Sequence, residues 1–259
     1  MRTMTHGEKL KFLTEYLIAE RPDAARFKLP DIEGELFQLF RSLMNVREAG
    51  QISGEFLKIQ DEFLQEETHR KGIVDIADLT PVQPDIYLWQ GDITTLKCGA
   101  IVNAANSGMT GCYYPCHGCI DNVIHTYAGV QLRLDCHRLM VQQGYPEPTG
   151  RAKITKAYNL PCDRVIHTVG PIVSGELTGT HCALLERCYI SCLEIADREK
   201  VGSIAFCCIS TGEFHFPNEA AAQIAVNAVK AYKAGSGSDI KVIFNVFKDI
   251  DLQIYKKLL

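Results

Sequence analysis

The sequence lacks the clusters of lysine and arginine with which proteins hold a polyanion. Its 259 residues carry 27 Lys and Arg against 31 Asp and Glu, which gives a formal net charge of −4. Binding by bulk electrostatics needs basic residues gathered on one face. The charge balance therefore does not favour a nucleic-acid-binding protein. A local anion site made of backbone N–H groups would need no such excess of positive charge.

Long apolar runs are also missing. No stretch reaches the roughly 20 residues that span a bilayer, and the first ten residues lack the continuous apolar segment of a secretion signal. We therefore expect a cytoplasmic protein with no membrane partner. Its eleven cysteines are then expected as thiols, some of them bound to metal, because disulfides are rare in a reducing compartment. Four of these cysteines lie in apolar helix or strand patterns and are expected in the core: Cys188, Cys192, Cys207 and Cys208.

The first 80 residues show the apolar spacing of helices. The pattern predicts helices over 9–19, 32–46 and 54–68, each with one apolar stripe. Three helices of this size bury little surface alone, so we expect residues 1–80 to form an extension packed on the rest of the protein. The alternative is an independent recognition module. A linker rich in proline, 80–84, ends this region.

From residue 84 onward, short apolar runs alternate with helical stretches. Continuous apolar runs are typical of strands covered on both faces, so the pattern predicts a three-layer α/β/α domain with a mostly parallel, mixed sheet over 84–259. The expected strands lie at 86–89, 100–102, 165–166, 204–209 and 242–247. The expected helices lie at 121–140, 180–200, 218–233, which Asn218 would cap, and 252–259.

Ligands of such sheets bind beyond the carboxyl ends of the strands, where several loops carry suitable groups. Asp92 could accept a hydrogen bond from an exocyclic amine, or it could cap a turn. The amides of Asn103 and Asn106 could bind ribose hydroxyls. The Ser210-Thr211-Gly212 turn could present backbone N–H groups to a phosphate, or be an ordinary strand-to-helix turn. We interpret His167, inside an apolar run, as a core histidine.

Together these stretches resemble the macrodomain, an α/β fold that binds ADP-ribose. The matching motifs are Gly91-Asp92-Ile93-Thr94, the Ala-Ile-Val-Asn-Ala-Ala-Asn run ending at Asn106, the run from Ile166 to Pro171, and the Ile209-Ser210-Thr211-Gly212 turn. The resemblance covers 84–259. It implies that Asp92 contacts the adenine amine, that Ser210 to Phe214 surround the diphosphate and distal ribose, and that Asn106 lies beside that ribose. The implied substrate-binding residues are Asp92, Ile93, Asn106, Ser210, Thr211, Gly212, Glu213, Phe214 and, for adenine stacking, Phe247.

The sequence departs from the common macrodomain pattern between Gly111 and Asn122. Hydrolytic macrodomains usually carry a run of glycines there, whereas this chain reads Gly-Cys-Tyr-Tyr-Pro-Cys-His-Gly-Cys-Ile-Asp-Asn. This loop and the helical extension make the chain similar to the zinc-containing microbial macrodomains that remove ADP-ribose from proteins. That resemblance implies that Asp121 is the catalytic aspartate, with Asn106 positioning the distal ribose.

Four candidate zinc ligands lie within eight residues of this loop. In an extended chain His117 and Cys119 point the same way and Cys116 points the opposite way, while Cys112 is far enough along the chain to turn back. We therefore expect one Zn²⁺ per chain on Cys112, His117 and Cys119, as the resemblance also favours. Three protein ligands leave one position open for chemistry. The alternative is a closed, structural site that also uses Cys116.

The leading hypothesis is a zinc-dependent hydrolase that releases mono-ADP-ribose from modified Asp or Glu side chains of proteins. Zinc would activate a water or hold a ribose hydroxyl and polarise the scissile bond, and Asp121 would orient or deprotonate the attacking water. His125, one turn further on, is expected to be structural. The alternatives are a non-catalytic reader that binds ADP-ribose on proteins, and a deacetylase of O-acetyl-ADP-ribose.

Overall fold

The structure is a computed structural model that describes residues 4–259. Residues 1–3 lie outside the described part. They begin both the expected extension and the N-terminal stretch without a secretion-signal pattern. The helices are α1 (His6–Ala19), α2 (Glu33–Val46), α3 (Gly54–Lys71), α4 (Ile120–Ala128), α5 (Val130–Gln143), α6 (Gly179–Arg198), α7 (Asn218–Ser236) and α8 (Asp249–Leu258). The strands are β1 (Val74–Asp75), β2 (Ile86–Gln90), β3 (Leu96–Lys97), β4 (Ala100–Ala105), β5 (Ala152–Lys156), β6 (Arg164–Val169), β7 (Ser203–Phe206) and β8 (Lys241–Val246).

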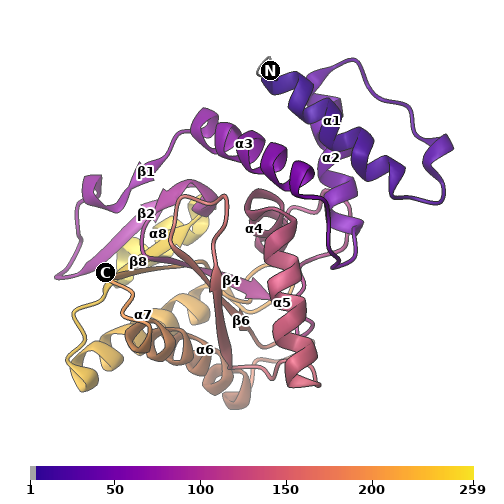
Figure 1. The fold of residues 1–259 in the computed structure, drawn as a ribbon. Coiled ribbons are helices and arrows are strands. Elements are labelled where there is room, and N and C mark those ends of the chain that lie inside the picture. Colours follow the sequence, from indigo (N-terminus) through magenta and orange to yellow (C-terminus); the bar gives the residue numbers. More distant parts are fainter. Residues whose placement is uncertain (1–3) are drawn as a thin grey trace.

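A six-stranded mixed sheet forms the centre of the molecule (Figure 1). Its order is β2-β8-β7-β4-β6-β5, and every neighbouring pair is parallel except β5 with β6. Helices α4 and α5 form one flanking group, and α7 packs against both α6 and α8 in a second. The three-layer α/β/α architecture expected from the sequence is thus confirmed. Because the five parallel strands share one direction, their carboxyl ends meet along one edge, where the site lies.

The sequence prediction missed the edge strand β5 and the short pair β1 with β3. Strand β5 reads Ala-Lys-Ile-Thr-Lys and is largely half-buried, with an exposed lysine at its end. It lacks the continuous apolar run of a strand covered on both faces, and its lysines are typical of an edge. The prediction therefore recognised the buried strands and overlooked the strand that closes the sheet.

Two predictions about helices were wrong. The single helix expected over 121–140 is two helices, α4 and α5, because Gly129 between them has a φ of +94°, a conformation that favours glycine. Asn218 does not cap α7. Pro217 occupies that position without a side-chain cap, while Asn218 Nδ2 donates to Asp251 Oδ1 at 2.6 Å.

Helices α1 to α3 enclose an apolar core of their own. Its fully buried side chains include Leu13, Phe40, Phe56, Phe63 and Leu64. Val130, at the start of α5, packs against this core from the other domain, and both α2 and α3 contact α4. The helical extension therefore adjoins the helix that follows the cysteine-rich loop.

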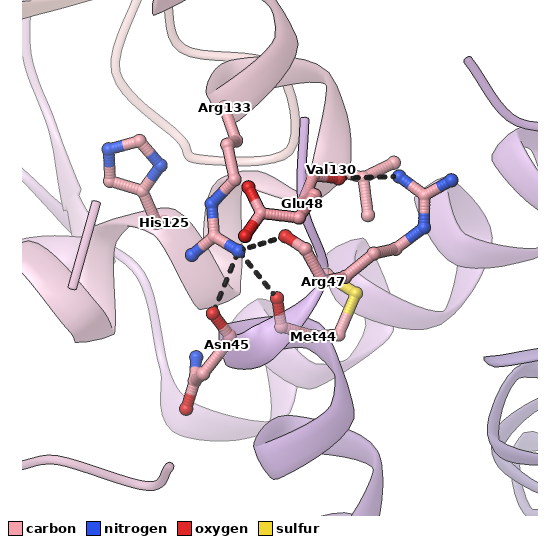
Figure 2. A pocket seen from close by; sticks show the side chains of 8 residues that line it. Met44, Asn45, Arg47, Glu48, His125, Val130 and Arg133 are labelled. Atoms are coloured by element: carbon pink, nitrogen blue, oxygen red, sulfur yellow. Dashed lines mark hydrogen bonds between the residues drawn. The ribbon is translucent and has the colours of Figure 1, made fainter. Parts of the chain in front are cut away.

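Arg133 of α5 joins the extension to the main domain. Its Nη1 donates to the carbonyl oxygens of Met44 at 3.0 Å, Asn45 at 2.8 Å and Arg47 at 2.5 Å (Figure 2). These carbonyl groups lie at the C-terminal end of α2, where no following turn of the helix supplies N–H donors for them. Its Nε donates to the carbonyl of Thr110 at 2.7 Å. One buried guanidinium thus links the end of α2 to the beginning of the cysteine-rich loop.

No helix within residues 4–259 combines the length and the apolar character that crossing a membrane requires.

Candidate functional site

The cysteine-rich loop brings three of its four candidate metal ligands together. Cys112 Sγ lies 3.6 Å from His117 Nδ1, and the ligand atoms of Cys112, His117 and Cys119 all lie within 4.8 Å of one another. All three residues are partly exposed to solvent. Zn–S bonds of about 2.3 Å and Zn–N bonds of about 2.0–2.1 Å at a tetrahedral angle require an S to N separation of about 3.6 Å. The cluster therefore fits a zinc ion without rearrangement of this pair.

Cys116 lies outside this cluster. Its backbone has a φ of +54°, its Sγ donates to the carbonyl of Gln38 at 3.3 Å, and its N–H donates to Asn45 Oδ1 at 2.9 Å. The left-handed backbone turns the sulfur towards α2. The arrangement favours three protein ligands over the closed four-ligand alternative.

His117 also faces a loop on the other side of the site. Its Nε2 lies 3.5 Å from Glu213 Oε1, while its Nδ1 faces Cys112. A carboxylate that accepts from the outer nitrogen of a metal-binding histidine fixes which nitrogen carries the proton. Glu213, expected to contact substrate, therefore also adjoins the metal cluster.

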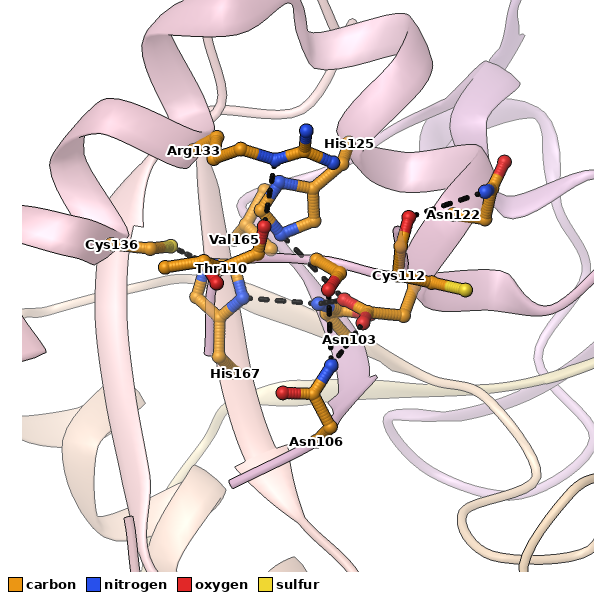
Figure 3. Close-up of polar contacts among 12 residues, drawn as sticks. Asn103, Asn106, Thr110, Cys112, Asn122, His125, Arg133, Cys136, Val165 and His167 are labelled. Atoms are coloured by element: carbon orange, nitrogen blue, oxygen red, sulfur yellow. Dashed lines mark hydrogen bonds and ion pairs between the residues drawn. The ribbon is translucent and has the colours of Figure 1, made fainter. Parts of the chain in front are cut away.

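Asp121 lies in the first turn of α4, two residues after Cys119. Asn103 Nδ2 donates to its Oδ1 at 2.8 Å, and Asn106 Nδ2 donates to its Oδ2 at 3.3 Å (Figure 3). Burial raises the pKa of Asp121 to about 6, although the Asn103 hydrogen bond and the Arg133 charge act in the opposite direction. A carboxyl group with a pKa near neutrality suits a general base.

Asn106 connects Asp121 to the loop that carries the cysteines. Besides Asp121, its Nδ2 donates to the carbonyl of Gly111 at 3.0 Å, and its Oδ1 accepts from the N–H of Gly108 at 2.9 Å. Gly111 directly precedes Cys112. The two predicted catalytic residues and the metal cluster therefore meet at the end of β4.

Asn103 plays a part that the sequence prediction did not assign to it. Its side chain is fully buried, so the expectation that it binds a ribose hydroxyl is wrong. The sheet register pairs it with His167, whose Nδ1 lies 3.1 Å from Asn103 Nδ2. The amide therefore points one proton at Asp121 and the other at His167. An asparagine inside the apolar run of β4 was the only sequence signal of this contact.

His167 is a hydrogen-bonded core histidine, as expected. With Nδ1 accepting from Asn103, its Nε2 carries the proton and faces Thr155 Oγ1 at 2.9 Å. Burial lowers the pKa of His167 to about 3, so the ring is neutral. His125, Cys136 and His167 form a second, fully buried group of potential metal ligands. Because both nitrogens of His167 face hydrogen-bonding partners, this group fits a core cluster better than a metal site.

His125 is buried beneath the cysteine-rich loop, consistent with the structural role expected for it. Its ring packs against Gly111, whose φ is +88°. Burial and the neighbouring His167 and Arg133 hold the pKa of His125 well below its usual value. Gly111 is therefore constrained twice, by its backbone conformation and by the imidazole behind it.

We expect Gly111→Ala to lower the free energy of unfolding by about 1–3 kcal/mol, because a non-glycine residue is strained at this φ. Its Cβ would also lie 2.8 Å from His125 Cγ. Gly118→Ala is the matched control in the same loop, since nothing lies within 4 Å of its Cβ position and its φ is not positive. Denaturant unfolding of both variants checks this. Equal losses of stability would contradict the specific constraint on Gly111.

Asp92 follows β2 and makes the capping interaction that the sequence left as an alternative. Its Oδ1 accepts from the N–H of Thr94 at 2.9 Å, and its carboxylate pairs with Lys71 at the end of α3. Burial alone would raise the pKa of Asp92, but the hydrogen bonds from Lys71 and Thr94 outweigh it and lower that pKa. The adjacent Ile93 is buried in the core, so only its backbone could take part in binding a ligand. An adenine contact stays a prediction for both residues.

The loop after β7 carries three backbone N–H groups that have no backbone partner among the described residues. Within it, the N–H groups of Thr211, His215 and Phe216 donate to backbone carbonyls. Among residues 4–259, no backbone partner engages the N–H groups of Gly212, Glu213 and Phe214, which are therefore available to an anion. Ser210, at a φ of +65°, starts this turn.

Phe247 follows the last residue of β8 and is 75% exposed. A large exposed aromatic ring at a strand end is a suitable surface on which a base can stack.

Lys71 lies at the same end of the sheet through its contact with Asp92. It also places its ammonium 3.6 Å from the centre of the Tyr127 ring. No local pattern indicated a role for Lys71, because its partners are more than 20 positions away along the chain.

Comparisons with known proteins show a family match and similar full-length relatives. The chain matches the Macro domain family over residues 102–225. It is 56% identical to a protein of Treponema medium named protein-ADP-ribose hydrolase, over 99% of this chain and 100% of the relative. A protein of the same name from Staphylococcus aureus strain MRSA252 is 49% identical, over 96% and 94%.

Solved structures of macrodomains also resemble this chain. The Trypanosoma brucei macrodomain in complex with ADP-ribose is 29% identical, with a TM-score of 0.65, over 84% of this chain and 94% of that one. The Oceanobacillus iheyensis macrodomain with ADP is 33% identical, with a TM-score of 0.60, over 66% and 88%.

Proposed function

The chain belongs to the macro domain family, and from this premise we propose that it is a zinc-dependent hydrolase that releases mono-ADP-ribose from Asp or Glu side chains of modified proteins. The broader activity, protein-ADP-ribose hydrolysis, is that of its full-length relatives. The observation that carries the zinc-dependent mechanism is the cluster of Cys112, His117 and Cys119 directly beside Asp121.

The residues of the strand-end loops support binding of ADP-ribose in one orientation. The three available N–H groups of 212–214 suit the diphosphate, and Asp92 and Phe247 suit the adenine. The distal ribose then lies towards Asn106, which is tied to both Asp121 and Gly111. In this orientation the bond to be broken lies beside the metal cluster.

Asp121 and its two asparagines supply the acid–base part of the reaction. Asp121 takes a proton from the attacking water while the water oxygen bonds to the anomeric carbon of the distal ribose. The bond from that carbon to the acyl oxygen breaks, and the electron pair leaves with the carboxylate of the modified protein. Asn103 and Asn106 hold the Asp121 carboxylate in place during the transfer.

Cys112, His117 and Cys119 would hold the zinc ion, and Glu213 would orient the imidazole of His117. When bound with three protein ligands, zinc supplies Lewis-acid polarisation at its open position. The remaining work, which is to bind, orient and move a proton, falls to the protein side chains.

A time course with an Asp- or Glu-linked ADP-ribosylated protein tests the proposal. We expect stoichiometric release of free ADP-ribose by the zinc-loaded protein, and a loss of turnover after zinc is removed with a chelator. Binding of the modified protein without release would instead identify a reader. Full activity of the metal-free protein would overturn the role of zinc, and activity on O-acetyl-ADP-ribose alone would overturn the protein substrate.

A further inference from the structure

Helix α2 of the extension faces the cysteine-rich loop and contacts it through Arg41. Arg41 Nη2 donates to the carbonyl of His117 at 2.6 Å and to Asn122 Oδ1 at 2.9 Å. His117 is a proposed metal ligand, and Asn122 is a fully buried residue in the first turn of α4. A guanidinium donates in a rigid, planar geometry. Arg41 therefore fixes the backbone of a ligand residue relative to α4.

Asn122 extends this contact to the other end of the loop. Its Nδ2 donates to the carbonyl of Tyr114 at 2.9 Å and to that of Cys112 at 3.4 Å. The carbonyls of Cys112 and His117 are thus held by one connected pair, Arg41 and Asn122. Cys119, the third ligand, is the N-cap of α4, the helix that carries Asn122.

Asn45, one turn after Arg41 on α2, holds the middle of the loop. Its Oδ1 accepts from the N–H of Cys116 at 2.9 Å, and its Nδ2 donates to Thr126 Oγ1 at 3.0 Å. Cys116 has a left-handed backbone, and Asn45 itself is buried. This bond stabilises the turn between Cys112 and His117 that brings the two ligands together.

We propose that Arg41 and Asn45 are positioning residues for the zinc ligands, so that the helical extension is a working part of the hydrolase site. This inference rests on the metal ligands of the proposed function. If zinc binding has to order the loop, the conformational entropy that the loop residues lose weakens their affinity for zinc. A loop that α2 already holds loses less entropy on binding zinc, and its ligand atoms stay at the separations that zinc requires.

Zinc affinity, measured by competition with a chromogenic chelator, tests this directly. We expect Arg41→Ala to bind zinc about 10–100-fold more weakly, the range found when an outer partner of a metal ligand is removed. Arg41→Lys should fall between this variant and the wild type, because lysine keeps the charge and loses the planar donor geometry. Arg70→Ala is the matched control, since Arg70 is an exposed arginine of the same extension that pairs with Glu33 and Glu67. It should bind zinc as the wild type does.

Hydrogen exchange of the zinc-free proteins gives a readout that does not depend on the metal. We expect the N–H of Cys116 to exchange at least about tenfold faster in Arg41→Ala and Asn45→Ala than in Arg70→Ala, because these variants release the loop. The dissociation constant for ADP-ribose should stay within about twofold, because the adenine and diphosphate contacts lie elsewhere. If Arg41→Ala fails to bind ADP-ribose, the comparison is made with Arg41→Lys.

The outcomes separate this inference from the proposed function. If the wild type binds no zinc, the proposed zinc role fails. Hydrogen exchange at Cys116 still decides the other question: faster exchange in the Arg41 and Asn45 variants shows that α2 orders the loop, and unchanged exchange shows that it does not. If the wild type binds zinc, and the Arg41 and Asn45 variants match it in zinc affinity and exchange, the positioning role is overturned and the zinc role stands.

Discussion

Replacing Asp121 with alanine is expected to lower kcat by about 10²–10⁴-fold, the contribution of a positioned general base, while the dissociation constant for ADP-ribose changes little. The reason is geometric. Both carboxylate oxygens of Asp121 are held by amides, and its pKa of about 6 suits the general-base role proposed for it. Removal of the carboxylate leaves the proposed adenine and diphosphate contacts intact. Single-turnover release of ADP-ribose and calorimetric binding of ADP-ribose measure the two effects separately.

The matched control for Asp121 is Asp163→Ala. Asp163 is an exposed aspartate directly before β6, so its removal should leave both kcat and binding unchanged. A second variant, Asp121→Asn, keeps the shape of the side chain and removes its basicity. If Asp121→Asn retained the wild-type kcat, proton transfer to this residue would not be part of the reaction.

The second large effect is expected from the cysteines. Cys112→Ala removes a proposed ligand and should weaken zinc binding by more than the roughly 100-fold upper range for an outer partner, with a matching loss of hydrolysis. Cys116→Ala should keep about one zinc per chain, because its sulfur faces the carbonyl of Gln38 outside the ligand cluster. Zinc content after dialysis, measured by elemental analysis, compares the two variants.

These two variants also distinguish between open and closed coordination. With three protein ligands, only Cys112→Ala loses zinc, whereas a closed four-ligand site would also lose zinc in Cys116→Ala. An equal loss in both variants would therefore contradict the catalytic geometry and favour a structural zinc. Thermal unfolding would show the same distinction, because a structural zinc contributes directly to folding stability.

The sequence predicted those parts of the fold that depend on local patterns. The buried parallel strands appeared as apolar runs, and the loops after them carried recognisable short motifs. Strand β5 was missed because only one of its edges is paired and two of its five residues are lysines. The break at Gly129 was missed because a helical pattern continues on both sides of it, and a single glycine inside such a pattern does not by itself end a helix.

In the candidate site, too, the sequence predicted the features that depend on local spacing. Cys112, His117 and Cys119 lie within one short segment, so spacing alone indicated that they could meet. The long-range contacts that hold this segment and its two ends come from Arg41, Asn45 and Arg133, between 23 and 81 positions away. Arginine and asparagine on helices normally face solvent, and no local pattern indicates which buried partner they reach. Long-range polar contacts of this kind require a structure.

The contacts between α2 and the cysteine-rich loop also determine when the site can form during folding. The hydrogen bonds of Arg41 and Asn45 join residues 71 to 81 positions apart. Contacts of such sequence separation require closure of a long loop and tend to slow folding. Helices α1 to α3 leave the ribosome first and have a core of their own, but α2 gains its partners only after α4 has been synthesised. The loop is therefore expected to become ordered late, after both the extension and α4 have formed.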